Sequence, residues 1–85
     1  MTIEERVAIG ARLLDKAMPG WYNKIDQETL DMGSCTHCIL GQLYGRSVIG
    51  LDHLAPHITY DIELCFYGGK QAWLSEIETR LSSNH

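Results

Sequence analysis

The stretch TIEERVAIGARLLDKAMPG, residues 2–20, carries its own signals for starting and ending a helix. Thr2 and Glu5 fit the capping-box pattern, in which the hydroxyl accepts the backbone N–H of residue 5 and the carboxylate reaches back. Pro19 and Gly20 follow as a stop signal. Between these signals, apolar or small residues recur at spacings of three and four: Ile3, Val7, Gly10, Leu14 and Ala17. The stretch therefore predicts an amphipathic helix with one buried face.

The C-terminal part of the chain predicts a second long helix, which begins after Gly68 and Gly69. Three apolar residues lie four positions apart and share one face of this helix: Trp73, Ile77 and Leu81. The charged residues of the segment fall off that face: Glu76, Glu78 and Arg80. This division into an apolar and a charged face is typical of a helix packed on a core.

Two shorter helices are expected between the long ones. SCTHCILGQLYG, residues 34–45, predicts a helix that has Ser34 as its N-cap and ends at Gly45. Ser47 can cap a second short helix, and Pro56 closes it. Both cysteines of the first stretch are then expected at the start of its helix.

The remaining segments predict a turn and an extended stretch. Asp26 can cap a short turn over QETL, residues 27–30. Apolar residues alternate with polar or small ones near 58–66, which is typical of a half-buried strand, but no second segment alternates as well. We therefore expect a mainly α fold: a single helical domain over residues 1–85, with about four helices and one short extended segment.

Composition narrows the class of protein. An 85-residue chain allows one domain, which buries roughly 60–65% of the surface that its unfolded chain exposes. With a net charge of −4 and seven scattered Lys and Arg residues, a nucleic-acid partner is disfavoured. No apolar run approaches the roughly 18 residues of a membrane helix, and MTIEERVAIG does not open as a signal peptide does. We expect a cytoplasmic protein.

The cysteines permit three interpretations. Three cysteines without a secretion signal indicate reduced thiols or metal ligands. Cys35 and Cys38, followed by His53 and His57, give the spacing C-x2-C-x14-H-x3-H, which is a zinc-site spacing in which two thiolates and two imidazoles can hold one tetrahedral ion. Pro56, however, interrupts any helix between the two histidines.

The other two interpretations need no metal. Free cysteine is among the most buried residue types, so Cys35 and Cys38 can be small core residues while the histidines lie on the surface. Alternatively, a C-x-x-C pair at a helix start can exchange disulfides, because the helix dipole lowers the pKa of the first thiol. The βα pattern that surrounds such a pair in thioredoxin-like proteins is missing around Cys35. The third cysteine, Cys65, is expected in the core.

Trp21 and Tyr22, which follow the first helix, are candidates for an exposed patch that recognises a partner. Trp73 could join them, although in a chain with one phenylalanine and two tryptophans at least one tryptophan is expected in the core.

Several elements together resemble a family of short uncharacterised proteins from bacteriophages, prophages and actinobacterial hosts. The most specific element is the cysteine pair leading into ILGQLYG, and the match spans about residues 10 to 80. The other elements are Gly20-Trp21, Ile25-Asp26, Leu30-Asp31, Gly50-Leu51, His57, and Ala72-Trp73 with Ile77. The resemblance implies a setting and no mechanism: small acidic phage proteins commonly bind a host protein. The family pattern does not fix His53, which leaves Cys35 and Cys38 as the firmer ligand candidates.

From these observations we predict a small phage-type protein that is not an enzyme, needs no cofactor, and acts by binding another macromolecule, most simply a host protein. A homo-oligomer is compatible with this prediction. The first alternative is a module stabilised by Zn²⁺ through Cys35, Cys38, His53 and His57. The second is a thiol–disulfide redox protein that uses Cys35 as its nucleophile.

Overall fold

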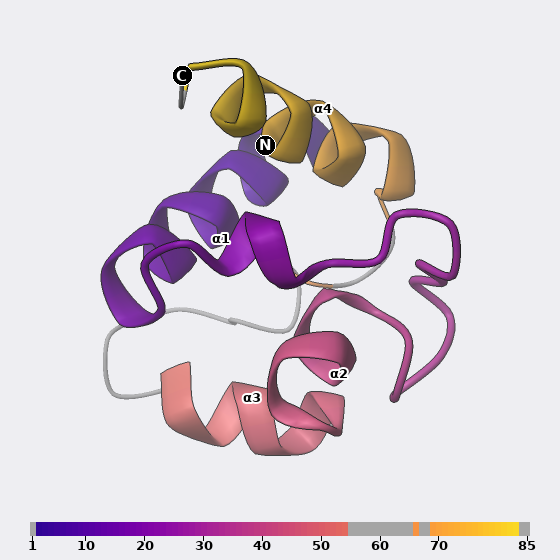
Figure 1. Cartoon of the computed structure of the whole chain (residues 1–85). Helices are drawn as coiled ribbons and strands as arrows, with labels where there is room; N and C mark the ends of the chain where they lie inside the picture. Colours follow the sequence, from indigo (N-terminus) through magenta and orange to yellow (C-terminus); the bar gives the residue numbers. More distant parts are fainter. Residues whose placement is uncertain (1, 55–65, 67–68, 84–85) are drawn as a thin grey trace.

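The computed structural model describes residues 2–54, 66 and 69–83, and the helical elements in them are α1 (Ile3–Ala17), the 3₁₀ helix η1 (Trp21–Lys24), α2 (Ile39–Tyr44), α3 (Ser47–Leu54) and α4 (Lys70–Ser83). The longer helices α1 and α4 pack together at one end, and α2 and α3 pack together at the other (Figure 1). η1 lies between the two pairs and contacts both α4 and α2. The mainly α fold predicted from the sequence is confirmed, as a small bundle with long terminal and short central helices.

The first helix follows its sequence signals closely. The Thr2 hydroxyl accepts the backbone N–H of Glu5 at 3.1 Å, and the Glu5 carboxylate accepts the backbone N–H of Thr2 at 3.3 Å, which completes the capping box. The buried face consists of Val7, Gly10, Ala11 and Leu14. The two ends of the predicted stripe, Ile3 and Ala17, are exposed.

The buried face of α4 differs from its prediction at one end. Trp73 and Ile77 are fully buried, but Leu81 is 37% exposed, so its predicted place in the core is wrong. The buried stripe continues through Arg80 instead, whose side chain is 17% exposed. Arg80 lies three residues after Ile77, so its side chain points toward α1 and η1. There the carboxylate of Asp15 and the ring of Trp21 bind its guanidinium.

The helix after the cysteine pair begins later than predicted. Ser34 caps a turn rather than a helix, because its hydroxyl accepts the backbone N–H groups of Thr36 and His37 at 3.3 and 3.2 Å. α2 starts at Ile39 with Cys38 as its N-cap, and the Cys38 sulfur accepts the N–H of Gly41 at 3.3 Å. This places Cys35 in the turn before the helix.

Gly41 allows that turn to lie directly on α2. A Cβ atom at this position would lie 2.5 Å from the carbonyl carbon of Thr36 and 2.6 Å from the carbonyl oxygen of Cys35. Any side chain would therefore collide with backbone, which cannot move aside cheaply. The same carbonyl of Cys35 accepts the N–H of Ser47 at 2.8 Å, so the turn also ties α2 to the start of α3.

Gln42 fastens a second loop to α2. Its side-chain oxygen accepts the N–H of Asp26 at 2.6 Å, and its side-chain nitrogen donates to the carbonyl oxygens of Asp26 and His37, both at 3.1 Å. The Asp26 side chain in turn accepts the N–H of Glu28 at 3.0 Å, which confirms the predicted turn over 27–30. One amide therefore anchors both ends of the long connection between η1 and α2.

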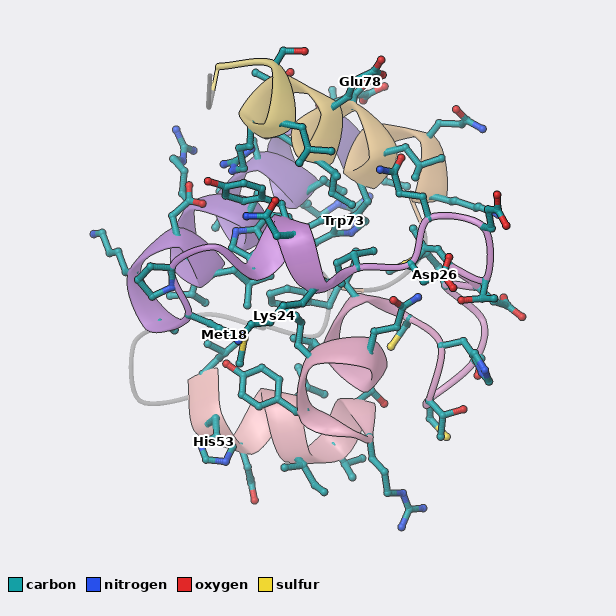
Figure 2. All side chains as sticks on the ribbon, viewed as in Figure 1. Met18, Lys24, Asp26, His53, Trp73 and Glu78 are labelled. Atoms are coloured by element: carbon teal, nitrogen blue, oxygen red, sulfur yellow. The ribbon has the colours of Figure 1, made fainter. Side chains whose placement is uncertain are left out.

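The core is centred on aromatic side chains between the two helix pairs (Figure 2). Trp21 and Trp73 meet edge to face with ring centroids 5.7 Å apart, and Phe66 stacks on Trp73 at 5.4 Å. Apart from Phe66, the predicted extended segment near 58–66 lies outside the described residues, as do Pro56 and Cys65. No strand occurs in the described part of the chain, and none of its helices is long and apolar enough to cross a bilayer.

Candidate functional site

The predicted partner-binding pair Trp21-Tyr22 is not an exposed patch. Trp21 is fully buried, and its indole N–H donates to Asp15 at 2.9 Å. Tyr22 is half-buried and packs edge to face on Trp21, with ring centroids 5.9 Å apart. The expectation that Trp21 is part of an exposed patch is therefore wrong, because the indole has both its apolar contacts and its hydrogen bond inside the chain.

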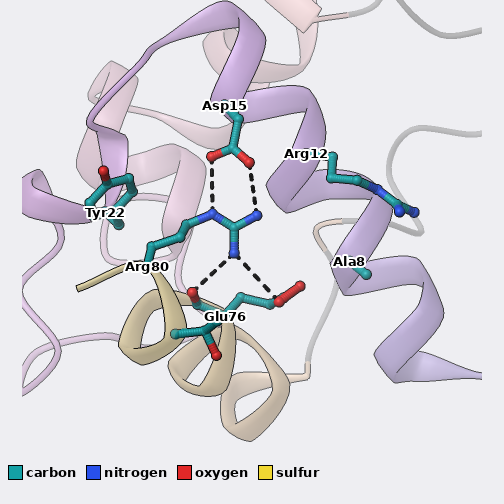
Figure 3. Close-up of a pocket in the computed structure, with 7 residues that line it drawn as sticks. Ala8, Arg12, Asp15, Tyr22, Glu76 and Arg80 are labelled. Carbon is teal, nitrogen blue, oxygen red and sulfur yellow. Dashed lines mark hydrogen bonds and ion pairs between the residues drawn. The ribbon is translucent and has the colours of Figure 1, made fainter. Parts of the chain in front are cut away.

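Trp21 belongs to a network that joins α1, η1 and α4, of which Figure 3 shows the paired side chains of Asp15 and Arg80. Arg80 donates to both carboxylate oxygens of Asp15, at 3.0 Å from Nε and 2.8 Å from Nη2, and its guanidinium carbon lies 5.6 Å from the centre of the Trp21 ring. Its Nη1 atom donates to the carbonyl oxygen of Glu76 at 3.0 Å. The bond from Arg80 lowers the pKa of Asp15, and the same bond raises the pKa of Arg80.

The network lines an open polar pocket of about 470 Å³ between α1 and α4. Figure 3 shows the guanidinium of Arg12 pointing away from the paired Asp15 and Arg80, so the pocket does not gather its positive charges around one point. Because Arg80 and Asp15 are bound to each other, these two charged groups serve to hold α1 and α4 together.

The two cysteines open onto a different cavity, a groove of about 310 Å³ that Leu51 and Phe66 also line. Cys35 is exposed and Cys38 is buried, and both are free thiols. Cys38 therefore behaves as the small core residue of the second interpretation, and its sulfur is occupied as a helix cap. Cys35 is the accessible thiol of the pair.

The structure does not assemble the described part of the predicted zinc set. His53 lies at the far end of α3 and stacks on Tyr44, with ring centroids 5.3 Å apart and an interplanar angle of 17° (Figure 2). Among the residues that the structure describes, no three His, Cys, Asp or Glu side chains come together, so Cys35, Cys38 and His53 do not converge on one point. The fourth predicted ligand, His57, lies outside the described residues.

The most distinctive exposed surface lies on α3, and the sequence interpretation missed it. Val48 is 60% exposed and Ile49 is 42% exposed, whereas Gly50 and Leu54 face inward. The signal was present in SVIGLDHL, because its apolar residues surround the helix on all sides instead of forming one stripe. A short helix on a small domain cannot bury all of its sides, so some of these apolar side chains must meet solvent or a partner.

Charged and polar side chains flank this apolar surface. Arg46, Asp52 and His53 are all exposed, with Arg46 immediately before α3 and the other two near its end. We call the set Arg46, Val48, Ile49, Asp52 and His53 the α3 face. Apolar side chains surrounded by polar ones are the usual composition of a protein-binding patch.

The chain matches no protein-family model, and comparisons with curated proteins and with solved structures gave no match either. A function for the chain therefore has to be inferred from its own residues.

Proposed function

We propose that this chain is a non-enzymatic module that acts by binding another protein through the α3 face. The observation that carries the proposal is the exposure of Val48 and Ile49, two adjacent β-branched apolar residues, on a helix at the edge of the molecule (Figure 1). Burying two such side chains against a partner would contribute about 1.5–3 kcal/mol for each one fully covered. In a domain with a thin core, leaving both outside forgoes the stabilisation that their burial would give.

Other exposed apolar side chains do not form a comparable patch. Among the described residues, four large apolar side chains are exposed: Ile3, Val48, Ile49 and Leu81. Ile3 is the first residue of α1 and Leu81 lies in the last turn of α4, and single exposed apolar residues of this kind are normal. Val48 and Ile49 differ because they are adjacent exposed apolar residues on one helix.

Composition and resemblance indicate the kind of partner. The net charge of −4 disfavours nucleic acid, so a protein is the better candidate. The resemblance to phage-type proteins favours a host protein in the cytoplasm as the natural target, and this setting forms part of the proposal.

Affinity capture with matched variants tests the proposal. Wild-type chain, Ile49→Glu and Leu81→Glu are each cross-linked in lysate, and captured proteins are quantified. Ile49→Glu removes the apolar centre of the α3 face, whereas Leu81→Glu makes the same change on α4 at the opposite end of the molecule (Figure 1). We expect a protein that wild type and Leu81→Glu retain and Ile49→Glu loses at least tenfold. Equal capture by all three chains would contradict the proposal.

A zinc-stabilised module is the second candidate, and one observation favours it: the thiols of Cys35 and Cys38 line the same groove. Thiolates three residues apart in a turn are a common half of a structural zinc site. Metal analysis of purified wild type and Cys35→Ser decides this case. One zinc per wild-type chain, lost in the variant together with thermal stability, would support the candidate; a metal-free chain of unchanged stability would eliminate it.

A further inference from the structure

We infer that the α3 face binds a second copy of this chain, with the two α3 helices antiparallel about a twofold axis at Ile49. This inference rests on the proposed function and names the partner that occupies the face when no other protein does. A twofold contact places the same surface on both chains, so every residue must meet a complementary residue of the other copy. The α3 face meets this condition.

The charges of α3 are spaced symmetrically about Ile49. Asp52 follows Ile49 by three residues within α3, so it lies on the same side of the helix. Arg46 precedes Ile49 by three residues and lies immediately before α3, where its carbonyl oxygen accepts the N–H groups of Ile49 and Gly50. In an antiparallel pair centred on Ile49, Arg46 of one chain lies opposite Asp52 of the other, at both ends of the contact. Both side chains are exposed, and neither has an ion-pair partner in the described part of the chain.

The same two charges are placed unfavourably for α3 alone. The N-terminus of a helix carries partial positive charge and the C-terminus partial negative charge. Arg46, whose carbonyl oxygen accepts the N–H of Gly50 in the first turn, puts a cation at the positive end, and Asp52 puts an anion near the negative end. An antiparallel second copy reverses both effects, because it sets an opposite charge and an opposite helix end beside each residue.

The shape of the molecule allows this contact. Gly50 faces inward, where a Cβ atom would lie 2.9 Å from Leu40 and Tyr44 side-chain atoms, so Ile49 is on the outer side of α3. α3 also lies at the edge of the molecule away from α4 (Figure 1). An eight-residue helix is about 12 Å long, so the contact is smaller than a standard interface of about 800 Å² per partner. We therefore expect weak association.

Sedimentation equilibrium over micromolar to millimolar protein tests the pairing through charge reversal. Arg46→Glu and Asp52→Arg each set like charges opposite one another at both ends. We expect each to weaken dimerisation about tenfold or more, because two exposed ion pairs are lost and replaced by repulsion. The double variant Arg46→Glu/Asp52→Arg restores opposite charges. We expect it to dimerise at least about threefold more strongly than either single variant, and more weakly than wild type because its charges already suit the ends of α3 alone.

Matched controls separate this pairing from general charge effects. Lys70→Glu makes the same charge change as Arg46→Glu at the start of α4, and it should leave dimerisation unchanged. A wild-type chain that stays monomeric at millimolar concentration, or a double variant no better than the single ones, overturns the inference. If the chain is monomeric but Ile49→Glu still loses a captured protein, the α3 face binds a different protein and the proposed function stands. If Ile49→Glu changes neither dimerisation nor capture, both fail.

Discussion

At the scale of single residues, Asp15 connects the buried tryptophan of η1 to the arginine of α4. It accepts the indole N–H of Trp21 and two N–H groups of Arg80. Asp15→Ala should lower the free energy of unfolding by about 2–3 kcal/mol at pH 7, because it leaves a buried indole N–H without an acceptor. Asp15→Asn keeps one acceptor oxygen for the indole, but it loses the charge and its amide nitrogen cannot accept from Arg80, so it should cost about 1 kcal/mol. Urea denaturation measures both, and equal losses would contradict the role assigned to the indole.

The same residue predicts a pH dependence. The pKa of Asp15 is lower in the folded chain than in the unfolded chain because Arg80 binds the ionised form. Its contribution is therefore complete above the unfolded pKa of about 3.9 and is lost as the pH falls through the folded pKa. The difference in unfolding free energy between wild type and Asp15→Asn should stay constant from pH 7 to about 5 and shrink at lower pH. A difference that grows toward acid pH would contradict the assignment.

The two tryptophans should respond differently to loss of the indole N–H. Trp21 donates to Asp15, whereas the indole nitrogen of Trp73 is buried without a hydrogen-bond partner among the described residues. Trp21→Phe should therefore cost about 1 kcal/mol more than Trp73→Phe in unfolding free energy. Circular dichroism follows unfolding without relying on tryptophan emission. The two replacements remove the same atoms, so each serves as the control for the other.

Sequence reasoning could place one tryptophan in the core but not choose between them. Trp21 follows a Pro-Gly turn beside a tyrosine, which is also the composition of a recognition patch. What buries it is an acceptor on α1 and a cation on α4 that lies 59 positions later in the chain. Contacts with residues this far away in the sequence produce no local pattern from which the burial of Trp21 could be predicted.

At the scale of elements, the close contact at Gly41 gives a test of how the cysteine turn is held. Alanine normally stabilises a helix by about 1 kcal/mol relative to glycine. Gly41→Ala should instead destabilise the chain by about 2 kcal/mol, because the new methyl group collides with the backbone of Cys35 and Thr36. Gly33→Ala is the control: its nearest contact is 3.4 Å away, and its φ is not in the left-handed region. Thermal denaturation in which Gly41→Ala is as stable as wild type would contradict this packing.

Helix ends with a single local signal were predictable, and those with competing signals were not. α1 was predictable because its capping box and its Pro-Gly stop act within a few residues. The start of α2 was misplaced because the hydroxyl of Ser34 serves a turn, leaving the cap to the sulfur of Cys38. Gln42 was also missed as an anchor, because the loop groups that it binds lie up to 16 positions away.

At the scale of the whole molecule, the two helix pairs share a core that is closed by aromatic contacts, while the α3 face stays outside it. The zinc spacing illustrates what sequence order cannot supply. Cys35 and His53 fall at a familiar distance along the chain, but the α2–α3 connection sends His53 to the far end of α3, where it stacks on Tyr44. Sequence spacing predicted which residues are close in space only where all of them lie in one helix or one turn.

Exposed and buried residues of α3 should differ in their effect on the free energy of unfolding. If Ile49 serves binding and not folding, Ile49→Glu should change the unfolding free energy by less than about 0.5 kcal/mol, as surface substitutions usually do. Leu54→Ala, in the next turn of the same helix but fully buried, should cost about 2–5 kcal/mol. Both are measured by urea denaturation of dilute protein, so that self-association does not add to stability. A loss for Ile49→Glu comparable to that for Leu54→Ala would place Ile49 in the core and remove the basis for a binding face on α3.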